Sequence, residues 1–464
     1  MVPEDASPLS SGVLSSPRAS PPGSIIERES SGECLVLCMV GLPARGKTYL
    51  AHKLERYLRW IGFSTKSFNI GNYRREQVGA QVGADFFNPA NDTGVSARRQ
   101  CAILALEDMI DWLTNKQGRV AIYDGTNSTL ERRKLVHTRI TRAGNETGIK
   151  FKVVWIESIC NDEALLEANI KNTKLSSPDY VGVDPDTAYR DFRARIANYE
   201  ASYQTLSEEE GCCYIKFIDT GKMMVTYRIE GIICSRIVYF LLHVRINHAP
   251  IYITRHGESE FNIQGKIGGD SPLSANGRQY ADKLAEFMKA ELAASNTGPL
   301  TVWCSTLKRT IETAAPIQKL IGVTPQQWRA LVEIEVGSCD GMTTADFDVE
   351  LPDEFAARKA DKLRYRYPRH TMQSGESYLD VIQRLEPVIF ELEKATTPVL
   401  VVGHRAVLRC VYAYFMDLPQ EDLPYVDLYL HRVLKLTNTA YGCEAETFDL
   451  SVDSIDQVKD QKLT

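Results

Sequence analysis

Residues 34–50 contain a buried strand, a glycine-rich turn and a helix start in immediate succession, and this order restricts the fold of the first half of the chain. The apolar run ends in Gly-Leu-Pro-Ala-Arg-Gly-Lys-Thr, after which helical spacing resumes. Gly41 and Gly46 permit a tight turn whose backbone N–H groups point at phosphate oxygens. Lys47 is placed to reach the β- and γ-phosphates, and the hydroxyl of Thr48 to hold Mg²⁺. A chance match in an ordinary strand–loop–helix is the alternative, but the context favours a P-loop that binds ATP or GTP.

A second strand with a polar end follows in the same half of the chain. Arg119–Asp124 ends in an acidic residue, which after a P-loop holds Mg²⁺ or accepts the proton of an attacking hydroxyl. Arginine pairs stand at Arg74-Arg75, Arg98-Arg99 and Arg132-Arg133, and we expect a helix at Gln100–Leu113 after the second pair. Since open α/β sheets bind ligands at the carboxyl edge of their strands, these guanidinium groups predict a phosphorylated substrate there.

The length and composition of the chain limit its class. Its 464 residues, 44% of them hydrophobic, are enough for about two to three domains with substantial cores. The formal charge of −6 provides no global basic field, so we expect no nucleic-acid or membrane partner. The 11 cysteines are scattered, as in a protein with reduced thiols. The N-terminus lacks the basic-then-apolar order of a signal peptide. The most apolar segment, Ile232–Leu242, carries Arg236 and is too short to span a membrane. These features predict a soluble cytoplasmic protein with reduced thiols.

Two strand-terminal histidines mark a second fold in the later part of the chain. After a connecting helix, one apolar strand ends in Arg255-His256-Gly-Glu and another ends in Gly-His404. One imidazole can attack phosphorus while the other helps to hold the transferring group, and arginines such as Arg309 neutralise its oxygens. A carboxylic acid must then protonate the leaving alkoxide, and Glu333 is the candidate. The pattern predicts a phosphohistidine enzyme.

Changes in composition divide the chain. Residues 1–32 are rich in Ser and Pro and predict a disordered arm, and 451–464 predict a flexible tail. Between them we expect a P-loop domain at 33–246 and a phosphohistidine domain at 247–450, each with a three-layer α/β/α fold.

A set of short motifs between Glu33 and Leu450 resembles one family. The motifs are GLPARGKTYL, DGTN, WIESICND, SPDY, ITRHGESEFN, IGGDSPLS, KRTIETA, YRYP, GESYLDV and AYGC. Their order, a P-loop kinase followed by a phosphoglycerate mutase-like histidine phosphatase, is similar to that of the 6-phosphofructo-2-kinase/fructose-2,6-bisphosphatase family. The resemblance implies that the chain makes and hydrolyses fructose 2,6-bisphosphate and so controls glycolysis and gluconeogenesis. It also implies a homodimer formed through the kinase domains.

The resemblance further implies roles for single residues. It implies that ATP is bound by Gly41, Ala44, Arg45, Gly46, Lys47, Thr48, Tyr49, Asn169 and Lys174, with Mg²⁺ on Thr48 and Asp124. It implies that fructose 6-phosphate is bound by Arg74, Arg98, Thr126, Arg132, Lys174, Arg195 and Tyr199. The fructose 2,6-bisphosphate contacts would be Arg255, Asn262, Gly268, Arg309, Arg358, Lys362, Tyr378, Arg405 and Arg409. The catalytic residues would be Lys47, Asp124 and Cys160 in the kinase and His256, Glu333 and His404 in the phosphatase.

Three features of the phosphatase half differ from the family pattern. Arg405 and Thr344 stand where the pattern has a glutamine and a tyrosine, and an extra segment, His370–Ser374, leads to Tyr378. These departures leave open a kinase-dominant enzyme with a weak or silent phosphatase, and a regulatory protein that binds sugar phosphates. A kinase that acts on a nucleotide or a nucleic acid end would suit the P-loop, but it leaves the second half of the chain unexplained.

Overall fold

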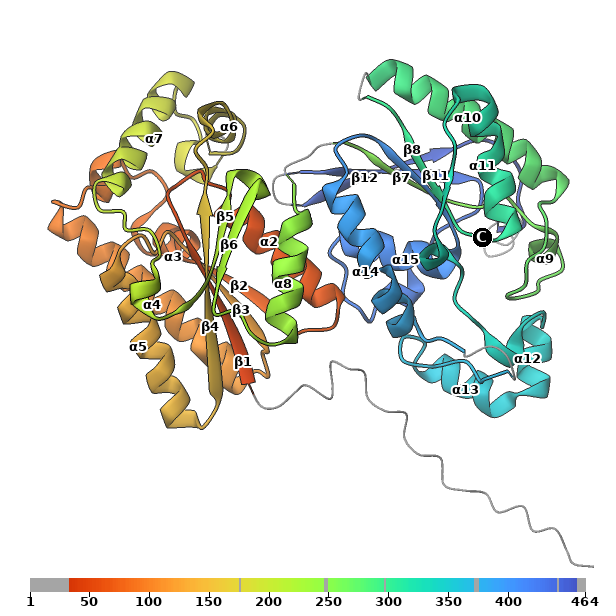
Figure 1. The fold of residues 1–464 in the computed structure, drawn as a ribbon, viewed down its shortest axis with the longest axis horizontal. Coiled ribbons are helices and arrows are strands. Elements are labelled where there is room, and N and C mark those ends of the chain that lie inside the picture. The colour runs from red at the N-terminus through yellow and green to blue at the C-terminus, as the bar shows by residue number, and fades with distance from the viewer. Residues whose placement is uncertain are drawn as a thin grey trace, which may run out of the picture.

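The computed structural model describes residues 33–174, 177–245, 249–295, 298–370, 375–439 and 442–456, without the side chains of 173 and 174. The predicted arm at 1–32 and the chain after 456 lie outside the described residues. Two α/β halves lie side by side, each built around its own six-stranded sheet (Figure 1). Among the helices that the structure describes, none is long and apolar enough to cross a membrane.

The N-terminal sheet has the order β2-β3-β1-β4-β5-β6, and all its neighbouring strands are parallel except β5 and β6. Its strands are β1 (Glu33–Val40), β2 (Thr65–Asn69), β3 (Val120–Asp124), β4 (Lys150–Ile159), β5 (Cys213–Ile218) and β6 (Met223–Tyr227). β1 is buried along almost its whole length, as expected of a strand that helices cover on both faces. The P-loop therefore begins at the carboxyl edge of the sheet, beside the ends of β3 and β4.

Helices cover both faces of this sheet. They are α2 (Lys47–Trp60), α3 (Ile70–Val78), α4 (Asp92–Asn115), α5 (Leu130–Thr147), α6 (Glu163–Asn169), α7 (Pro185–Glu200) and α8 (Ile232–His243), with a π-helical turn at Ile170–Lys174. Apolar side chains of α4 and α5 pack on one face, and those of α2 and α8 pack on the other. The α/β/α layering predicted for this half is confirmed.

The C-terminal sheet has the order β12-β11-β7-β10-β8-β9. Its strands are β7 (Ile251–Arg255), β8 (Thr301–Cys304), β9 (Gln326–Gln327), β10 (Val399–Gly403), β11 (Arg432–Asn438) and β12 (Cys443–Asp449). β7 and β10 are parallel neighbours, with Gly403 opposite Arg255. This register brings His256 and His404, the residues that follow the two strands, to the same edge of the sheet.

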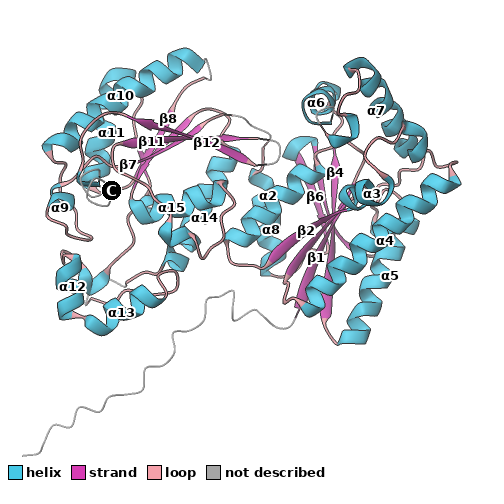
Figure 2. Cartoon of the chain, turned by 180° about the vertical axis from the view of Figure 1, so that it is seen from behind, coloured by secondary structure: helices cyan, strands magenta, loops and turns pink. Residues whose placement is uncertain are grey.

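The helices of this half are α9 (Glu260–Ile263), α10 (Ala275–Ser295), α11 (Lys308–Ile321), α12 (Thr344–Glu350), α13 (Pro352–Ala360), α14 (Tyr378–Lys394) and α15 (Arg405–Phe415). α10 and α11 pack on one face of the sheet. α14 and α15 cover the other face and also contact α8 and α2 of the first half (Figure 2). One apolar core thus runs from the first sheet through four helices to the second sheet.

Buried charges lie within this contact between the halves. Lys53 Nζ donates to the two Glu393 carboxylate oxygens at 3.1 and 2.8 Å, and Arg56 donates to the same group at 2.5 Å. Tyr414 adds a hydroxyl donor at 2.7 Å. Burial opposes ionisation of Glu393, but the two cations lower its pKa to about 2. The carboxylate is therefore charged and fully paired inside the interface.

Two sequence predictions of element limits are wrong. The helix expected at Gln100–Leu113 begins at Asp92, because the Asn91 side chain accepts from the N–H of Gly94 and caps it there. The tail predicted to be flexible from 451 onward is packed as far as 456. Val452 is 3% exposed, and Asp456 forms an ion pair with Arg255 at 2.6 Å.

Candidate active sites

The P-loop has the backbone shape of an anion cradle. Ala44 and Gly46 have positive φ values of 58° and 79°, and no side chain caps the first N–H groups of α2. Asn169 Nδ2 donates to the Ala44 carbonyl at 3.2 Å, and the Ser158 hydroxyl donates to the Arg45 carbonyl. Since these carbonyls are held from outside, the loop N–H groups can face a phosphate.

Several predicted nucleotide contacts line one cavity beside the loop. Its lining residues include Arg45, Gly46, Tyr49, Cys160 and Asn169. Burial raises the pKa of the Cys160 thiol, so the thiol stays protonated and lines the cavity rather than acting as a nucleophile. The catalytic role predicted for Cys160 stays a prediction, and the raised pKa excludes only a thiolate nucleophile.

Asp124 stands at the end of β3, close to the P-loop. It is 3% exposed and accepts a hydrogen bond from Asn69 Nδ2. The next predicted residue, Thr126, accepts from the Gly41 N–H through its carbonyl at 2.9 Å and so ties the two loops together. Sequence reasoning missed Asn69, although its place at the end of β2 matches that of Asp124 at the end of β3.

Arginines from three helices converge beyond the loop. Burial lowers the pKa of Arg98, and the positive charges of Arg132 and Arg195 lower it further, so the three cations are close. Arg98 Nη1 and Arg195 Nε are buried with no partner among the described residues. Arg98 also lies 5.8 Å from the Tyr199 ring centre and Arg195 lies 3.8 Å from that of Phe87, a residue that the sequence did not indicate. Unpaired guanidinium N–H groups in a buried cluster suit a phosphate dianion.

Arg74 differs from these arginines because its terminal nitrogens already have partners. Nη1 donates to the Gly79 and Ala80 carbonyls at 2.9 and 3.0 Å, and Nη2 donates to both Asp179 oxygens at 2.8 and 2.7 Å. Asp179 also accepts from Arg195 at 3.3 Å. Asp179 belongs to the SPDY motif, but its partner Arg74 is 105 residues away in sequence. The side chain of the predicted ligand Lys174 lies outside the described part of the chain.

His256 has the geometry of a nucleophile. Its Nδ1 lies 2.7 Å from the Gly257 carbonyl, which can only accept, so the proton sits on Nδ1 and the Nε2 lone pair is available. Burial, with Arg309 and Arg255 nearby, holds the pKa of His256 well below its ordinary value. The imidazole is therefore neutral at pH 7.

His404 faces His256 across the site, with 5.2 Å between their ring centres. Its Nε2 lies 2.7 Å from the Ser305 hydroxyl, which in turn contacts Thr310 at 2.8 Å. Its Nδ1 is buried without a partner among the residues that the structure describes. The sequence did not single out Ser305, yet this residue directly follows β8 at the same sheet edge.

Glu333 and two arginines complete the phosphoryl site. Glu333 Oε1 accepts from the N–H groups of Ile334 and Ala406 at 2.9 and 3.1 Å, which places the carboxyl group at the start of α15, beside His404. Arg309 is 5% exposed and donates to the Gly269 carbonyl at 2.7 Å. Arg255 is 6% exposed and is oriented by Asp456.

A cluster of basic side chains adjoins this site. Burial lowers the pKa of Lys362 to about 7, with further lowering by Arg409, Arg358 and Arg405. Arg409 Nη1 donates to the Tyr378 hydroxyl at 3.1 Å. Four of the predicted bisphosphate contacts thus form one cationic cluster, which consists of Arg358, Lys362, Arg405 and Arg409.

The other predicted positions lie on loops and helix starts. Asn262 closes a capping box with Ser259 at the start of α9, and Gly268 has a φ of 75°. A Cβ atom at Gly268 would collide with Asp340, so the loop requires glycine there. Thr344 is exposed at the first position of α12, and residues 371–374 of the extra segment lie outside the described residues.

Fold and site together define a P-loop kinase joined to a histidine phosphatase, and comparisons with known proteins agree. The 6-phosphofructo-2-kinase family matches residues 23–248, and the histidine phosphatase superfamily (branch 1) matches residues 251–450. The chain is 46% identical over 435 residues to 6-phosphofructo-2-kinase/fructose-2,6-bisphosphatase of Gallus gallus, covering 93% of this chain and 88% of that protein. It is 47% identical to 6-phosphofructo-2-kinase/fructose-2,6-bisphosphatase 1 of Homo sapiens, with the same coverage. The chain belongs to the 6-phosphofructo-2-kinase/fructose-2,6-bisphosphatase family, which confirms the resemblance seen in its motifs.

Proposed function

We propose that the chain makes fructose 2,6-bisphosphate from ATP and fructose 6-phosphate in its N-terminal half, and hydrolyses it to fructose 6-phosphate and phosphate in its C-terminal half. The observation that carries this proposal is the pairing of two sites in one chain of this family. One combines a P-loop with partly buried arginines, two of whose N–H groups have no partner among the described residues, and the other combines two facing histidines with a cluster of basic side chains.

In the kinase reaction, the P-loop N–H groups and Lys47 bind the phosphates of ATP. Lys47 donates to the Leu42 carbonyl at 2.5 Å, which keeps its ammonium group at the loop. Arg98, Arg132 and Arg195 bind the 6-phosphate of the sugar, and Asp124 accepts the proton of the 2-hydroxyl as it attacks.

Thr48 and Asp124 are the residues that would hold Mg²⁺ with ATP. Their donor set is a hydroxyl and a buried carboxylate at the loop, which are hard oxygen ligands of the kind that Mg²⁺ prefers. When bound, the ion would neutralise charge on the β- and γ-phosphates.

In the phosphatase reaction, His256 Nε2 attacks the 2-phosphoryl group. A bond forms between nitrogen and phosphorus, the bond to the sugar oxygen breaks, and Glu333 gives its proton to that oxygen. Arg255, Arg309 and His404 stabilise the transferring group, and water then releases phosphate. Thr344 is exposed on α12, whereas Arg405 directly follows His404 and its charge lowers the pKa of Arg255, so Arg405 lies close to the phosphoryl site.

The chain also offers a surface for self-association. β6 is the edge strand of the first sheet, and Met223 and Val225 on it are 55% and 39% exposed. Tyr239 on the neighbouring α8 is 53% exposed. Since exposed apolar edge strands tend to pair, we infer a homodimer through this edge. We also infer a cytoplasmic location, because all eleven cysteines are free.

Two parallel assays of the purified protein test the function. One supplies ATP, Mg²⁺ and fructose 6-phosphate, and the other supplies fructose 2,6-bisphosphate alone. Product in both supports the proposal. Product in the first assay alone would indicate a kinase with a silent phosphatase, and product in neither would indicate a regulatory binding protein.

A further inference from the structure

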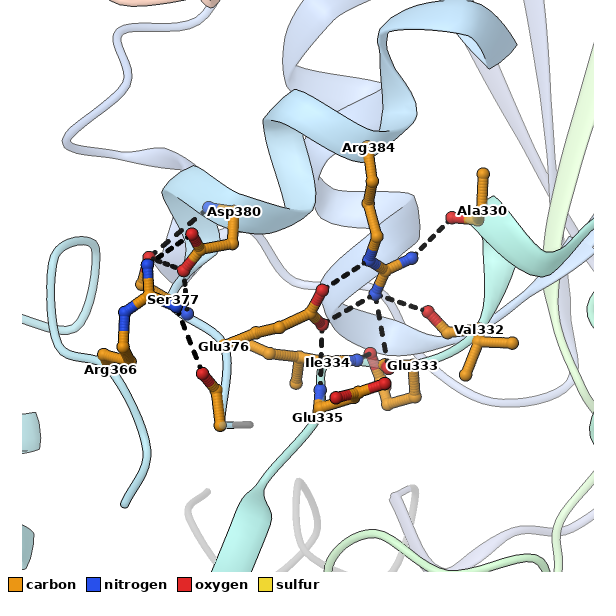
Figure 3. A network of polar contacts seen from close by, with 11 residues as sticks. Ala330, Val332, Glu333, Ile334, Glu335, Arg366, Glu376, Ser377, Asp380 and Arg384 are labelled. Carbon is orange, nitrogen blue, oxygen red and sulfur yellow. Dashed lines mark hydrogen bonds and ion pairs between the residues drawn. The ribbon is translucent and has the colours of Figure 1, made fainter. Parts of the chain in front are cut away.

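The segment that carries Glu333 has little regular structure of its own. After a single helical turn at Arg329–Leu331, the backbone runs irregularly through Glu335. Figure 3 shows Arg384, from α14, reaching into this segment. Its Nη1 donates to the Ala330 carbonyl at 2.5 Å, and its Nη2 donates to the Val332 and Glu333 carbonyls at 2.7 and 3.3 Å. One side chain thus fixes the backbone immediately before the proposed general acid and at the acid itself.

Glu376 holds Arg384 in this position and also binds the segment. Its carboxylate accepts from Arg384 Nε at 2.8 Å and from Nη2 at 3.0 Å. Glu376 Oε2 accepts from the Glu335 N–H at 3.0 Å, and the Glu376 N–H donates to the Glu335 carbonyl at 2.8 Å. Both side chains are largely buried, at 23% and 14% exposed. Arg384 and Glu376 therefore form a clamp around the acid-bearing segment.

The position of the Glu333 carboxyl group depends on this backbone. Its side chain extends to the start of α15, where Oε1 accepts from the Ala406 N–H. A shift of the segment would move the carboxyl group relative to His256 and the leaving oxygen. Because proton transfer requires close approach, a displacement of about 1 Å can cost on the order of 100-fold in rate.

We propose that Arg384 and Glu376 are positioning residues that place Glu333 for protonation of the leaving sugar oxygen. The inference rests on the proposed phosphatase function, which it deepens. A clamp with this role matters only when the leaving group needs a proton. The alkoxide of fructose needs one, whereas the 4-nitrophenolate ion departs without one, and in both cases His256 Nε2 forms the same bond to phosphorus.

The test compares the two leaving groups in Arg384→Gln, Arg384→Lys and Glu376→Gln. Single-turnover labelling of the protein by fructose 2-[³²P],6-bisphosphate measures phosphorylation of His256 with the sugar as leaving group. The burst of 4-nitrophenol from 4-nitrophenyl phosphate measures the same step with 4-nitrophenolate, which leaves without a proton. Arg366→Gln is the matched control, because Arg366 pairs with Asp380 of α14 and touches Gly375, but does not reach the acid-bearing segment (Figure 3). Glu333→Gln is the reference for loss of the acid.

We expect the rate of the sugar reaction to fall about 10- to 100-fold in the clamp variants, and the rate of the 4-nitrophenol burst to fall less than about threefold. We expect the same pattern for Glu333→Gln. Arg366→Gln should retain both rates. Equal losses with the two substrates would overturn the proposal in favour of a structural role, and so would unchanged rates. Absence of sugar-phosphate hydrolysis in the unsubstituted protein would instead refute the proposed function.

Discussion

Glu393→Gln should destabilise the contact between the two halves of the chain. The substitution keeps the shape of the side chain but removes the negative charge that Lys53 and Arg56 share. Both cations are about 6% exposed, so neither can regain water without opening the interface. Burial and Arg56 already lower the pKa of Lys53 to about 8, and loss of the carboxylate would lower it further.

The size of the effect follows from the pKa of Glu393. The pKa is about 2 in the folded protein against an ordinary 4.5, and this difference corresponds to about 3 kcal/mol of stability when the group is ionised. That contribution is present above pH 4.5 and disappears as the pH falls toward 2. Breaking a buried ion pair from one side costs a similar 3–5 kcal/mol. For 464 residues, an unfolding entropy of about 1 kcal/mol/K then gives a decrease in Tm of about 3–5 °C.

Thermal unfolding at pH 7, followed by circular dichroism, measures this decrease. Glu391→Gln is the matched control, because Glu391 lies on the same helix, is 39% exposed and pairs only with Lys394 in the described structure. We expect its Tm to change by less than about 1 °C. An unchanged Tm in Glu393→Gln would refute the reasoning, since it would mean that water reaches the cations.

Three further outcomes follow from the sites. Lys47→Met should abolish synthesis of fructose 2,6-bisphosphate and spare its hydrolysis; retained synthesis would remove Lys47 from its role. His256→Ala should abolish the acid-labile label on the protein, whereas a persisting label would point to another nucleophile. Lys362, with its pKa lowered to about 7, loses its charge as the pH rises through 7, so kcat/KM for the bisphosphate should fall above that pH. Arg405→Gln removes one of the charges that lower this pKa, and the fall should then move to higher pH; an unmoved profile would contradict this assignment.

The sequence predicted the parts of the sites that lie at strand ends. A P-loop between a buried strand and a helix, and a histidine after an apolar strand, are local patterns. The carboxyl edge of a parallel sheet then brings them together, as the register of β7 and β10 does for His256 and His404. For this reason the fold class was predictable, and so was the meeting of His256 and His404 at one edge of the sheet.

The contacts that orient these residues were not predictable, because they join segments far apart in the chain. Ser305 and His404 are 99 residues apart, Arg74 and Asp179 are 105 apart, and Arg255 and Asp456 are 201 apart. The tail was expected to be flexible because it is polar and short, but Asp456 forms an ion pair with the buried Arg255. Polarity alone does not distinguish a solvated aspartate from one paired with a buried arginine.

The most direct test of the account follows one phosphoryl group through both sites. The protein is incubated with [γ-³²P]ATP, Mg²⁺ and fructose 6-phosphate, and acid-labile label on the protein is measured over time. The account predicts that label reaches His256 only when fructose 6-phosphate is present, that Lys47→Met prevents it, and that labelled bisphosphate restores it in that variant. Label that appears without fructose 6-phosphate, or that persists in Lys47→Met without added bisphosphate, would contradict the claim that the two halves make and break the same bond in sequence.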